Sequence, residues 1–227
     1  MTAPYRQHVP RPDDARPGRL PRWTELEAVD RAHVSIERVR GAFATVRAPV
    51  IGDGSVEAAV LVPIAALGDE ASVLLIRRSD LVLDPGHIAF PGGHVEAGES
   101  PLNAALRETE EEIGLDRAEI EVIGAFPPIG RRRGDARVAP FVGLVHGRPV
   151  LVPDRDEVAE VFEVPIAALA EDRASWQEVW AIGSDDVEMT FFGGIAELGS
   201  ELVWGLSARI LSALLVRVLL GGEKATV

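Results

Sequence analysis

The sequence predicts one α/β or α+β domain in which short strands surround a sharply framed helix, with an extension before the domain. Short apolar runs bounded by turn residues recur along the chain, as is typical of buried strands. The framed helix is expected over residues 101–113, between a serine–proline start and a glycine stop. A chain of 227 residues that is 47% hydrophobic can bury one good-sized core and is short for two ordinary domains.

Seven apolar runs are predicted to be strands, and a second helix closes the chain. The expected strands are residues 58–63, 72–76, 87–90, 120–126, 138–145, 161–164 and 187–192. The closing helix, residues 202–220, has a broad apolar face and is expected to pack against other elements. Strands that enclose helices in this order favour a layered sandwich. We divide the chain into an extension (1–45), a main domain (46–222) and a tail (223–227).

The extension has two predicted parts. Residues 1–23 combine turn formers with scattered charges and lack periodicity, which predicts a mobile or loosely docked arm. Thr24 is a candidate N-cap for an accessory helix over residues 25–40, where apolar side chains recur at helical spacing.

Composition excludes several classes of function. A net charge of −13 argues against a general nucleic-acid binder, because such binding draws most of its affinity from clustered Lys and Arg. The absence of cysteine excludes disulfides, thiolate metal sites and a cysteine nucleophile. Residues 1–20 lack an apolar run of signal-peptide length, so we expect a cytoplasmic protein. The apolar stretch 204–220 contains two arginines and is shorter than the roughly 20 residues of a bilayer span, so no membrane partner is expected.

Three glutamates, Glu108, Glu111 and Glu112, share one face of the predicted helix because they lie at positions i, i+3 and i+4. Like charges at this spacing repel, and in the last turns of a helix the macrodipole also disfavours anions, typically by about 0.3–1 kcal/mol each. Bound Mg²⁺ or Mn²⁺ removes both penalties, since hard divalent ions bind carboxylate and phosphate oxygens together. The alternative is a solvated acidic surface, which is what most glutamate runs are.

The residues around this helix stand in a fixed register. They are Gly93, five residues, Glu99, seven residues, Arg107–Glu108, two residues, Glu111–Glu112, one residue and Gly114, followed by apolar Leu115. Ser100 and Pro101 supply the N-cap and the first-turn proline, and Gly114 supplies the stop. All seven fixed positions coincide with the Nudix box, so the chain resembles the Nudix hydrolases. The register favours a catalytic helix over an acidic surface.

The resemblance implies a fold and a set of roles. The fold is a Nudix-type α/β/α sandwich with a mixed central β-sheet and a catalytic loop-helix-loop. The implied metal ligands are the Gly92 carbonyl, Glu108 and Glu112, with Glu111 binding directly or through water. Arg107 is implied to orient the glutamates, with Glu99 holding Arg107 in place.

The implied reaction is metal-assisted attack of water on a phosphorus of a small nucleotide-type substrate. Nudix enzymes differ in their general base, which is often a glutamate outside the box. Glu157, Glu160 and Glu163 are the candidates here, and we favour Glu157. The alternative for each of them is a solvated surface charge.

Residues 74–93 resemble the segment before the box in the coenzyme A pyrophosphatase branch of the family. The matching residues are Leu74–Leu75, Arg78–Ser79, Gly86 and Phe90–Pro91–Gly92–Gly93, with further similarity at Phe126–Pro127–Pro128, 157–165 and 203–211. The sequence departs from that branch at Leu83 or Asp84, where the branch has an arginine, and at Ile76, where it has threonine. The resemblance implies hydrolysis of coenzyme A, or of an acyl derivative, to 4′-phosphopantetheine and adenosine 3′,5′-bisphosphate.

Several basic residues are candidates for binding the substrate. Arg77, Arg78 and His87 lie shortly before the box, although a lone histidine beside a strand is more often a packing residue. Arg131, Arg132 and Arg133 form the most basic cluster and could pair with an extra phosphate, such as the 3′-phosphate of coenzyme A. The alternative is a solvated hairpin loop.

Other functions stay open at this point. One is hydrolysis of ADP-ribose, an ADP-sugar, a dinucleoside polyphosphate or an oxidised nucleotide by the same chemistry. Another is a non-catalytic, ligand-sensing regulator, but such proteins tend to have a degraded box and an added DNA-binding segment. Here the box is intact and seven residues follow Leu220. The resemblance also implies a homodimer.

Overall fold

The computed structural model describes residues 5–44, 56–130 and 137–221, and its centre is a mixed sheet of eight strands. The strands are β2 (Ala58–Leu67), β3 (Glu70–Arg78), β4 (Ile88–Ala89), β5 (Gly92–His94), β6 (Ile120–Ala125), β7 (Ile129–Gly130), β8 (Arg137–Val145) and β9 (Val158–Pro165). The main path is β4-β3-β2-β8-β6, with β5 on β2, β7 on β8 and β9 on β3. β2 and β8 run parallel, whereas the other pairs are antiparallel.

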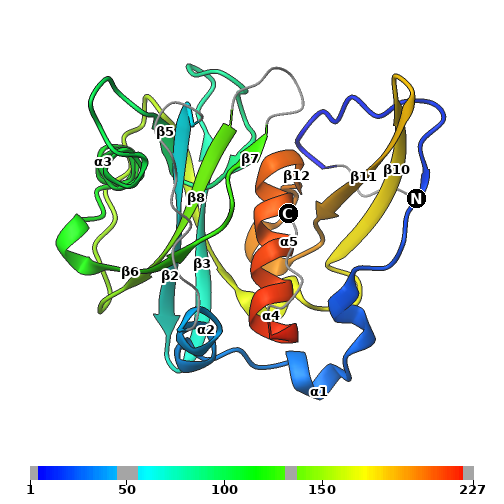
Figure 1. The fold of residues 1–227 in the computed structure, drawn as a ribbon, viewed down its shortest axis with the longest axis horizontal. Coiled ribbons are helices and arrows are strands. Elements are labelled where there is room, and N and C mark those ends of the chain that lie inside the picture. Colours follow the sequence, from blue (N-terminus) through cyan, green and yellow to red (C-terminus); the bar gives the residue numbers. More distant parts are fainter. Residues whose placement is uncertain (1–4, 45–55, 131–136, 222–227) are drawn as a thin grey trace.

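Helices cover both faces of this sheet, as Figure 1 shows. α3 (Pro101–Ile113) lies on one face, and α2 (Ile36–Phe43) and α5 (Gly205–Leu220) lie on the other. β2 is buried on both sides, because Ala59 and Leu61 belong to the core under α3, whereas Val62 and Ile64 belong to the core with α5. This two-sided burial explains why the strand is a continuous apolar run. The predicted α/β/α sandwich with a mixed central sheet is confirmed.

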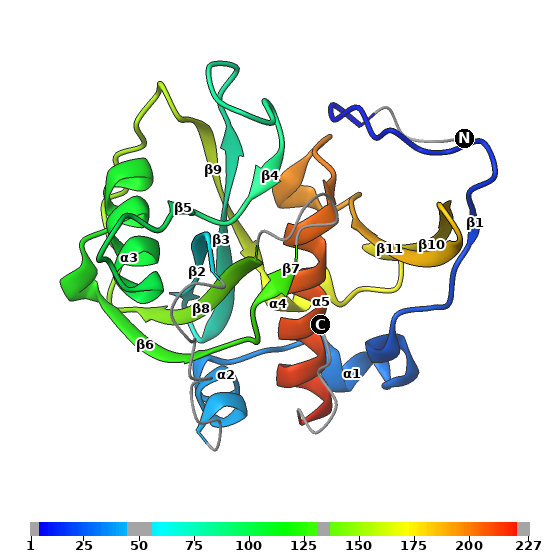
Figure 2. The same ribbon diagram turned by 45° about the horizontal axis from the view of Figure 1, so that its top comes forward.

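A second, antiparallel sheet lies beyond α5 and forms an additional layer (Figures 1 and 2). Its strands, in spatial order, are β1 (Arg16–Pro17), β10 (Ser175–Ile182), β11 (Asp185–Phe192) and β12 (Val203–Trp204). The strand prediction at 187–192 is confirmed by β11, but β10 was not predicted. Its apolar residues are interrupted by polar ones, including the buried Glu178, so it has no clear strand signature.

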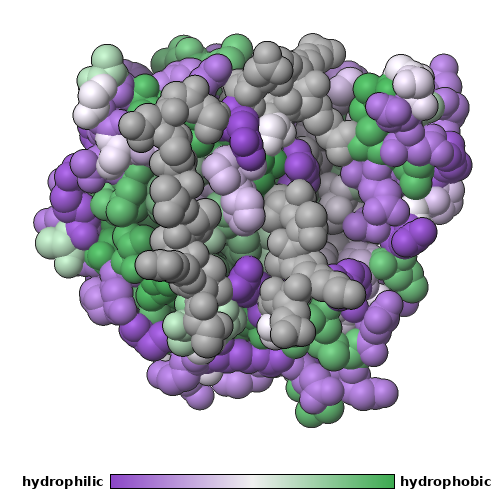
Figure 3. Space-filling view, in the orientation of Figure 1, coloured by the Kyte–Doolittle hydropathy of each residue, from purple (hydrophilic) through white to green (hydrophobic). Residues whose placement is uncertain are grey.

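The predicted strands of the central sheet and both predicted main helices are present, with ends that shift by a few residues. The remaining short elements are η1 (Arg22–Glu25), α1 (Ala28–Arg31), η2 (Arg117–Glu119), α4 (Ile166–Leu169) and η3 (Ala196–Leu198). In the described part of the chain, no helix is long and apolar enough to cross a membrane. The face drawn in Figure 3 mixes hydrophilic and apolar residues, and one apolar group lies on the left of the view, below α3.

The predicted accessory helix over residues 25–40 is wrong. The chain there forms η1, α1 and α2 as three separate pieces, and Thr24 donates its hydroxyl to the Pro21 carbonyl instead of capping a helix. The break has a tertiary cause, because the Val34 carbonyl accepts a hydrogen bond from Ala71 N–H and Val34 is fully buried. Ser35 then caps α2 by accepting a hydrogen bond from Arg38 N–H at 3.2 Å.

The predicted loose docking of residues 1–23 is also wrong for residues 5–23, which the structure describes. This segment, called here the N-terminal arm, runs along the outer side of β10 and pairs with it through β1 (Figures 1 and 2). Trp23 and Gln7 are buried, at 2% and 9% exposure. Arg11 donates from its Nε to the buried carboxylate of Glu178 at 2.8 Å. Specific polar contacts therefore hold an arm that has no apolar periodicity.

Candidate active site

The predicted frame of α3 is confirmed at both ends. Ser100 Oγ accepts a hydrogen bond from Asn103 N–H at 3.2 Å, and Pro101 occupies the first helical turn. Gly114 adopts the left-handed conformation with φ +69°, and its N–H donates to the Glu110 carbonyl at 2.9 Å. These local caps fix where the helix begins and ends, and therefore where its glutamates lie along the helix axis.

Two glycines bring the chain past the helix at close range. Gly92 has φ +144°, and a Cβ there would lie 2.3 Å from the carbonyl oxygen of Ala59 on the neighbouring strand. A Cβ on Gly93 would lie 2.4 Å from the carboxyl carbon of Glu108. The missing side chain at Gly93 therefore makes the space that the Glu108 carboxylate occupies.

Glu112 is the most deeply buried carboxylate of the box, at 3% exposure. Its Oε2 accepts a hydrogen bond from Gly92 N–H at 2.9 Å, whereas the Arg78 guanidinium lies 3.9 Å from Oε1, beyond hydrogen-bonding distance. The pKa of Glu112 is raised to about 8, mainly by burial and to a smaller extent by the nearby carboxylates of Glu108 and Glu157, whereas the hydrogen bond from Gly92 and the charge of Arg78 lower it.

Arg107 gathers the other carboxylates of the box around one guanidinium. It donates to both oxygens of Glu99, at 3.2 and 3.1 Å, and to Glu108 and Glu111, each at 2.9 Å. Its NH2 also donates to the carbonyl of His94 at 3.2 Å. The hydrogen bonds with Arg107 lower the pKa of Glu99. The geometry thus places Arg107 between Glu99 and the glutamates, as the resemblance implies.

The donor set suits a hard divalent cation. Glu112 is a buried carboxylate whose ion pair with Arg78 is long, at 3.9 Å, and Glu108 lies against the glycine turn that also contains Gly92. Among the described residues, however, no group of three or more acidic or histidine side chains is already arranged to hold an ion. In this arrangement Arg107 bonds one oxygen of Glu108 and one oxygen of Glu111, which leaves the second oxygen of each carboxylate outside these two bonds.

A loop over residues 79–87, called here the 79–87 loop, lies beside Glu112. Arg78, just before the loop, donates from its Nε to the Leu83 carbonyl at 2.8 Å while its NH1 faces Glu112. The base of the loop is closed by Arg78 N–H donating to the His87 carbonyl at 3.0 Å and Gly86 N–H donating to the Arg78 carbonyl at 3.1 Å. The position of the Arg78 guanidinium therefore depends on the conformation of this loop.

The three candidate bases lie in different surroundings. Glu157 lies near enough to Glu112 to raise its pKa, and its carbonyl accepts a hydrogen bond from Ser79 N–H at 2.8 Å. Glu160 pairs with Arg77 at 3.1 Å, and Glu163 is exposed and lies opposite Leu74 in the sheet. Of the three, Glu157 is the one that the structure brings to the box.

The predicted substrate-binding residues do not all gather at this site. The Arg77 guanidinium is held by Glu160 and by the buried Glu201, the latter at 3.7 Å. The His87 ring contacts the Trp204 ring, with centroids 5.4 Å apart, which fits the packing alternative. Arg131, Arg132 and Arg133 lie outside the described residues.

Sequence reasoning missed the polar residues that tie the N-terminal arm to the rest of the protein. Gln7 and Glu201 are buried and in contact, and Glu178 is buried with the N–H groups of two tryptophans directed at it. Gln7 is far from Glu201 in the sequence, and Arg11 is far from Glu178, so no local pattern in a single sequence identifies these contacts.

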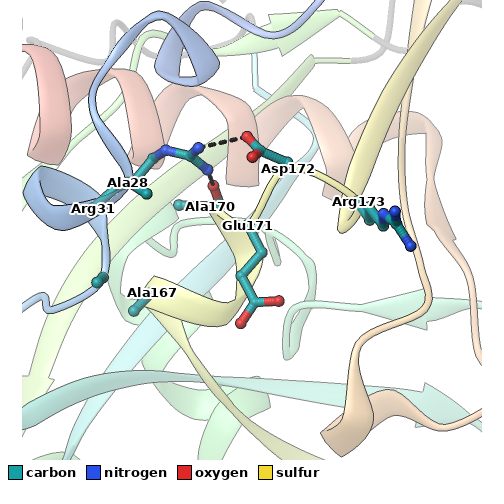
Figure 4. Close-up of a pocket in the computed structure, with 8 residues that line it drawn as sticks. Ala28, Arg31, Ala167, Ala170, Glu171, Asp172 and Arg173 are labelled. Atoms are coloured by element: carbon teal, nitrogen blue, oxygen red, sulfur yellow. Dashed lines mark hydrogen bonds and ion pairs between the residues drawn. The ribbon is translucent and has the colours of Figure 1, made fainter.

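A hollow of about 420 Å³ lies away from this site, between α1 and the end of α4 (Figure 4). Its buried Arg31 points to the Ala170 carbonyl and to Asp172, whereas Arg173 points away. The Arg31 guanidinium thus joins α1 to the segment after α4. The residues that line the hollow include none of the carboxylates of the box.

Comparisons with known proteins agree with the geometry of the box. The NUDIX domain family model matches residues 56–181. The protein named Uncharacterized Nudix hydrolase NudL from Yersinia enterocolitica is 36% identical over 165 residues, which cover 71% of this chain and 80% of that protein. Its namesake from Pectobacterium atrosepticum is 31% identical over 163 residues, covering 71% and 82%.

Among solved structures, a MutT/nudix family protein from Enterococcus faecalis matches with a TM-score of 0.47 and 24% identity, over 82% of this chain and 70% of that one. The family itself rests on the domain match and on the sequence relatives. The chain therefore belongs to the Nudix hydrolase family, whose members act on nucleoside-diphosphate-linked substrates.

Proposed function

We propose that this protein hydrolyses the pyrophosphate bond of coenzyme A or an acyl-coenzyme A, with Mg²⁺ or Mn²⁺, to 4′-phosphopantetheine and adenosine 3′,5′-bisphosphate. The observation that carries the hydrolytic part is the approach of Glu112 and Glu108 to the Gly92–Gly93 turn, with Arg107 holding the neighbouring carboxylates. The substrate part rests on the resemblance of residues 74–93 to one branch of the family.

In this proposal the carboxylates of Glu108 and Glu112 and the carbonyl of Gly92 hold the cation, with Glu111 as a further or water-mediated ligand. When held there, such an ion would supply positive charge that neutralises the pyrophosphate and lowers the pKa of a water molecule. Arg107, anchored by Glu99, orients the carboxylates of Glu108 and Glu111. Arg78 orients a phosphate oxygen, and Glu157 takes the proton from the attacking water.

The position of the matching segments supports the coenzyme A assignment. Arg78 and Ser79, which match the branch, begin the 79–87 loop, and Gly86, which also matches, closes it. Ser79 Oγ donates to the Asp156 carbonyl, next to Glu157. The 203–211 segment approaches the same loop through the contact of Trp204 with His87. Segments that resemble the branch thus meet around one loop beside Glu112.

One departure from the branch falls in the same loop, whereas the other, Ile76, is buried in β3. Leu83, at 74% exposure, and Asp84 are the two residues that can stand where the branch has an arginine, and neither an apolar nor an anionic side chain pairs with a phosphate. Arg131, Arg132 and Arg133 are proposed to supply that contact to the 3′-phosphate. The proposal predicts that removing these charges weakens binding of coenzyme A more than binding of 3′-dephospho-coenzyme A.

The first test is product analysis of purified protein with Mg²⁺ or Mn²⁺ against coenzyme A, acetyl-coenzyme A, ADP-ribose, NADH and 8-oxo-dGTP. Release of adenosine 3′,5′-bisphosphate supports the proposal. Cleavage of a different nucleotide supports the hydrolytic mechanism and overturns the coenzyme A assignment. If none of the compounds is cleaved in a metal-dependent reaction, both the mechanism and the substrate assignment are overturned.

Two variants on the same helix separate chemistry from helix stability. Glu112→Gln removes a proposed ligand and is expected to lower kcat by about 100-fold or more, because metal charge stabilisation is worth several kcal/mol in the transition state. Glu110→Gln is the matched control, since Glu110 is exposed and pairs with Arg117 at 3.3 Å on another side of α3. It is expected to keep wild-type activity.

A further inference from the structure

Gln7 of the N-terminal arm is a buried amide that joins three segments of the chain. Its Nε2 donates to the carbonyl of Gly86 at 3.0 Å and also to the carboxylate of Glu201. Its Oε1 accepts a hydrogen bond from Leu202 N–H at 2.7 Å. Both amide hydrogens and the amide oxygen therefore have partners, which a buried amide needs.

The Gly86 end of this contact lies in the 79–87 loop. Gly86 has φ +71° and the preceding Asp84 has φ +55°, so the turn uses two left-handed residues, one of them not glycine. Such a conformation persists when its surroundings hold it in place. The other side of the loop is held by Ser79, whose hydroxyl donates to the Asp156 carbonyl.

The same loop positions Arg78. The Leu83 carbonyl fixes Arg78 Nε at 2.8 Å, and the opposite side of the guanidinium faces Glu112 at 3.9 Å. A shift of the loop therefore moves the guanidinium relative to the carboxylates. Gln7 contacts none of these catalytic groups, but it is bonded to the loop that orients Arg78.

We propose that Gln7 is a positioning residue for the hydrolytic reaction, because it clamps the 79–87 loop and thereby places the Arg78 guanidinium against the substrate phosphates. This inference rests on the proposed function in assigning a phosphate to Arg78. The holding of the loop by Gln7 does not depend on the substrate and can be measured without it.

The arm contains a matched control for this role. Arg11 also bonds a buried carboxylate, that of Glu178, but it does so on β10 and makes no contact with the 79–87 loop among the interactions described. Arg11→Met weakens the docking of the arm and leaves Gln7 in place. Gln7→Met keeps the length of the side chain and removes the bond to Gly86.

Amide hydrogen exchange of the metal-free protein tests the clamp directly. The amides of Arg78, Gly86 and His87 donate within the base of the loop, at 3.0, 3.1 and 3.3 Å. Gln7→Met is expected to speed their exchange, whereas Arg11→Met leaves them protected. Unchanged protection of the three amides in folded Gln7→Met overturns the inference. If Gln7→Met does not fold, Gln7→Asn, which keeps the amide but withdraws it by one methylene, is measured instead.

Kinetics of metal-dependent hydrolysis test the link to Arg78. Gln7→Met is expected to raise KM by about 10-fold, with a smaller effect on kcat, because a small misplacement of a binding group is costly. In an Arg78→Gln background the same substitution is expected to have almost no further effect on KM. If the increases in KM caused by Gln7→Met and by Arg78→Gln multiply in the double variant, the two residues act independently and the inference is overturned.

The two experiments also separate this inference from the proposed function. If the wild type cleaves none of the substrates, the proposed function fails and the exchange of the three amides decides whether Gln7 holds the loop. If cleavage occurs but Gln7→Met behaves like Arg11→Met in both assays, the positioning role alone is overturned.

Discussion

The α3 helix and the N-terminal arm both bury polar groups, but the partners of those groups lie at very different distances along the chain. Within α3, Ser100 and Gly114 make their capping bonds to residues three and four positions away. In the arm, Gln7 bonds to residues 79 and 195 positions away, and Arg11 to one 167 positions away. Local bonds leave a signature in the sequence, whereas long-range bonds do not.

The difference has a consequence for how each region responds to substitution. The carboxylates of α3 repel one another and are held by Arg107, so a change there is expected to alter activity more than folding. The arm contributes little periodic apolar packing, so a change there is expected to alter stability first. Substitutions in each region test this division.

Gly93→Ala is expected to have a large effect on activity, comparable with that of Glu112→Gln. The added Cβ would lie 2.4 Å from the carboxyl carbon of Glu108, and because this is the end of a flexible side chain, the carboxylate moves and the fold survives. We expect a loss of about 100-fold in kcat/KM with little change in melting temperature. Gly130→Ala, at a glycine with open space around its Cβ position, is the control for both measurements.

The pH dependence of stability tests the burial of Glu112. Its folded pKa is raised to about 8 from 4.5, so the folded state binds the proton more tightly and loses stability as the pH rises from about 4.5 to about 8. In EDTA, Glu112→Gln is therefore expected to gain stability relative to the wild type over this window, by an amount on the order of a few kcal/mol. Urea unfolding of both proteins at pH 5, 6.5 and 8 measures it. A constant difference between the two contradicts the raised pKa.

Arg11→Met tests the long-range anchoring of the arm. Glu178, which is 4% exposed, keeps the N–H groups of Trp176 and Trp180 but loses its cation. Because Arg11 is itself half-exposed, we expect a loss of about 1–3 kcal/mol in unfolding free energy. Arg16→Met, which breaks the exposed pair with Asp186, is expected to cost about 0–1 kcal/mol. Equal losses in the two variants would show that burial of Glu178 is unimportant.

The fold and the box could be predicted where the determinants are local or periodic. The strands β2, β3 and β8 of the central sheet are buried on both faces and therefore appear as apolar runs, and the caps of α3 are adjacent to it in sequence. β10 could not be predicted in this way, since Glu178 interrupts its apolar pattern and is buried because of Arg11 and two tryptophans. The carboxylates of the site could be predicted from their spacing in the sequence, whereas the contacts of Gln7 could not.

The predicted helix over residues 25–40, which the structure replaces by three short pieces, gives a further test of local against long-range contacts, with the smallest expected effect. A helix capped by Thr24 would lose stability when Thr24 is replaced. The structure instead places the N-cap at Ser35, whose Oγ accepts a hydrogen bond from Arg38 N–H. Ser35→Ala is therefore expected to lower the unfolding free energy by about 1 kcal/mol. Thr24→Ala removes a hydroxyl bonded to the Pro21 carbonyl and is expected to cost less. The reverse order in denaturant unfolding would favour one continuous helix and would mean that the pairing of Val34 with Ala71 does not interrupt it.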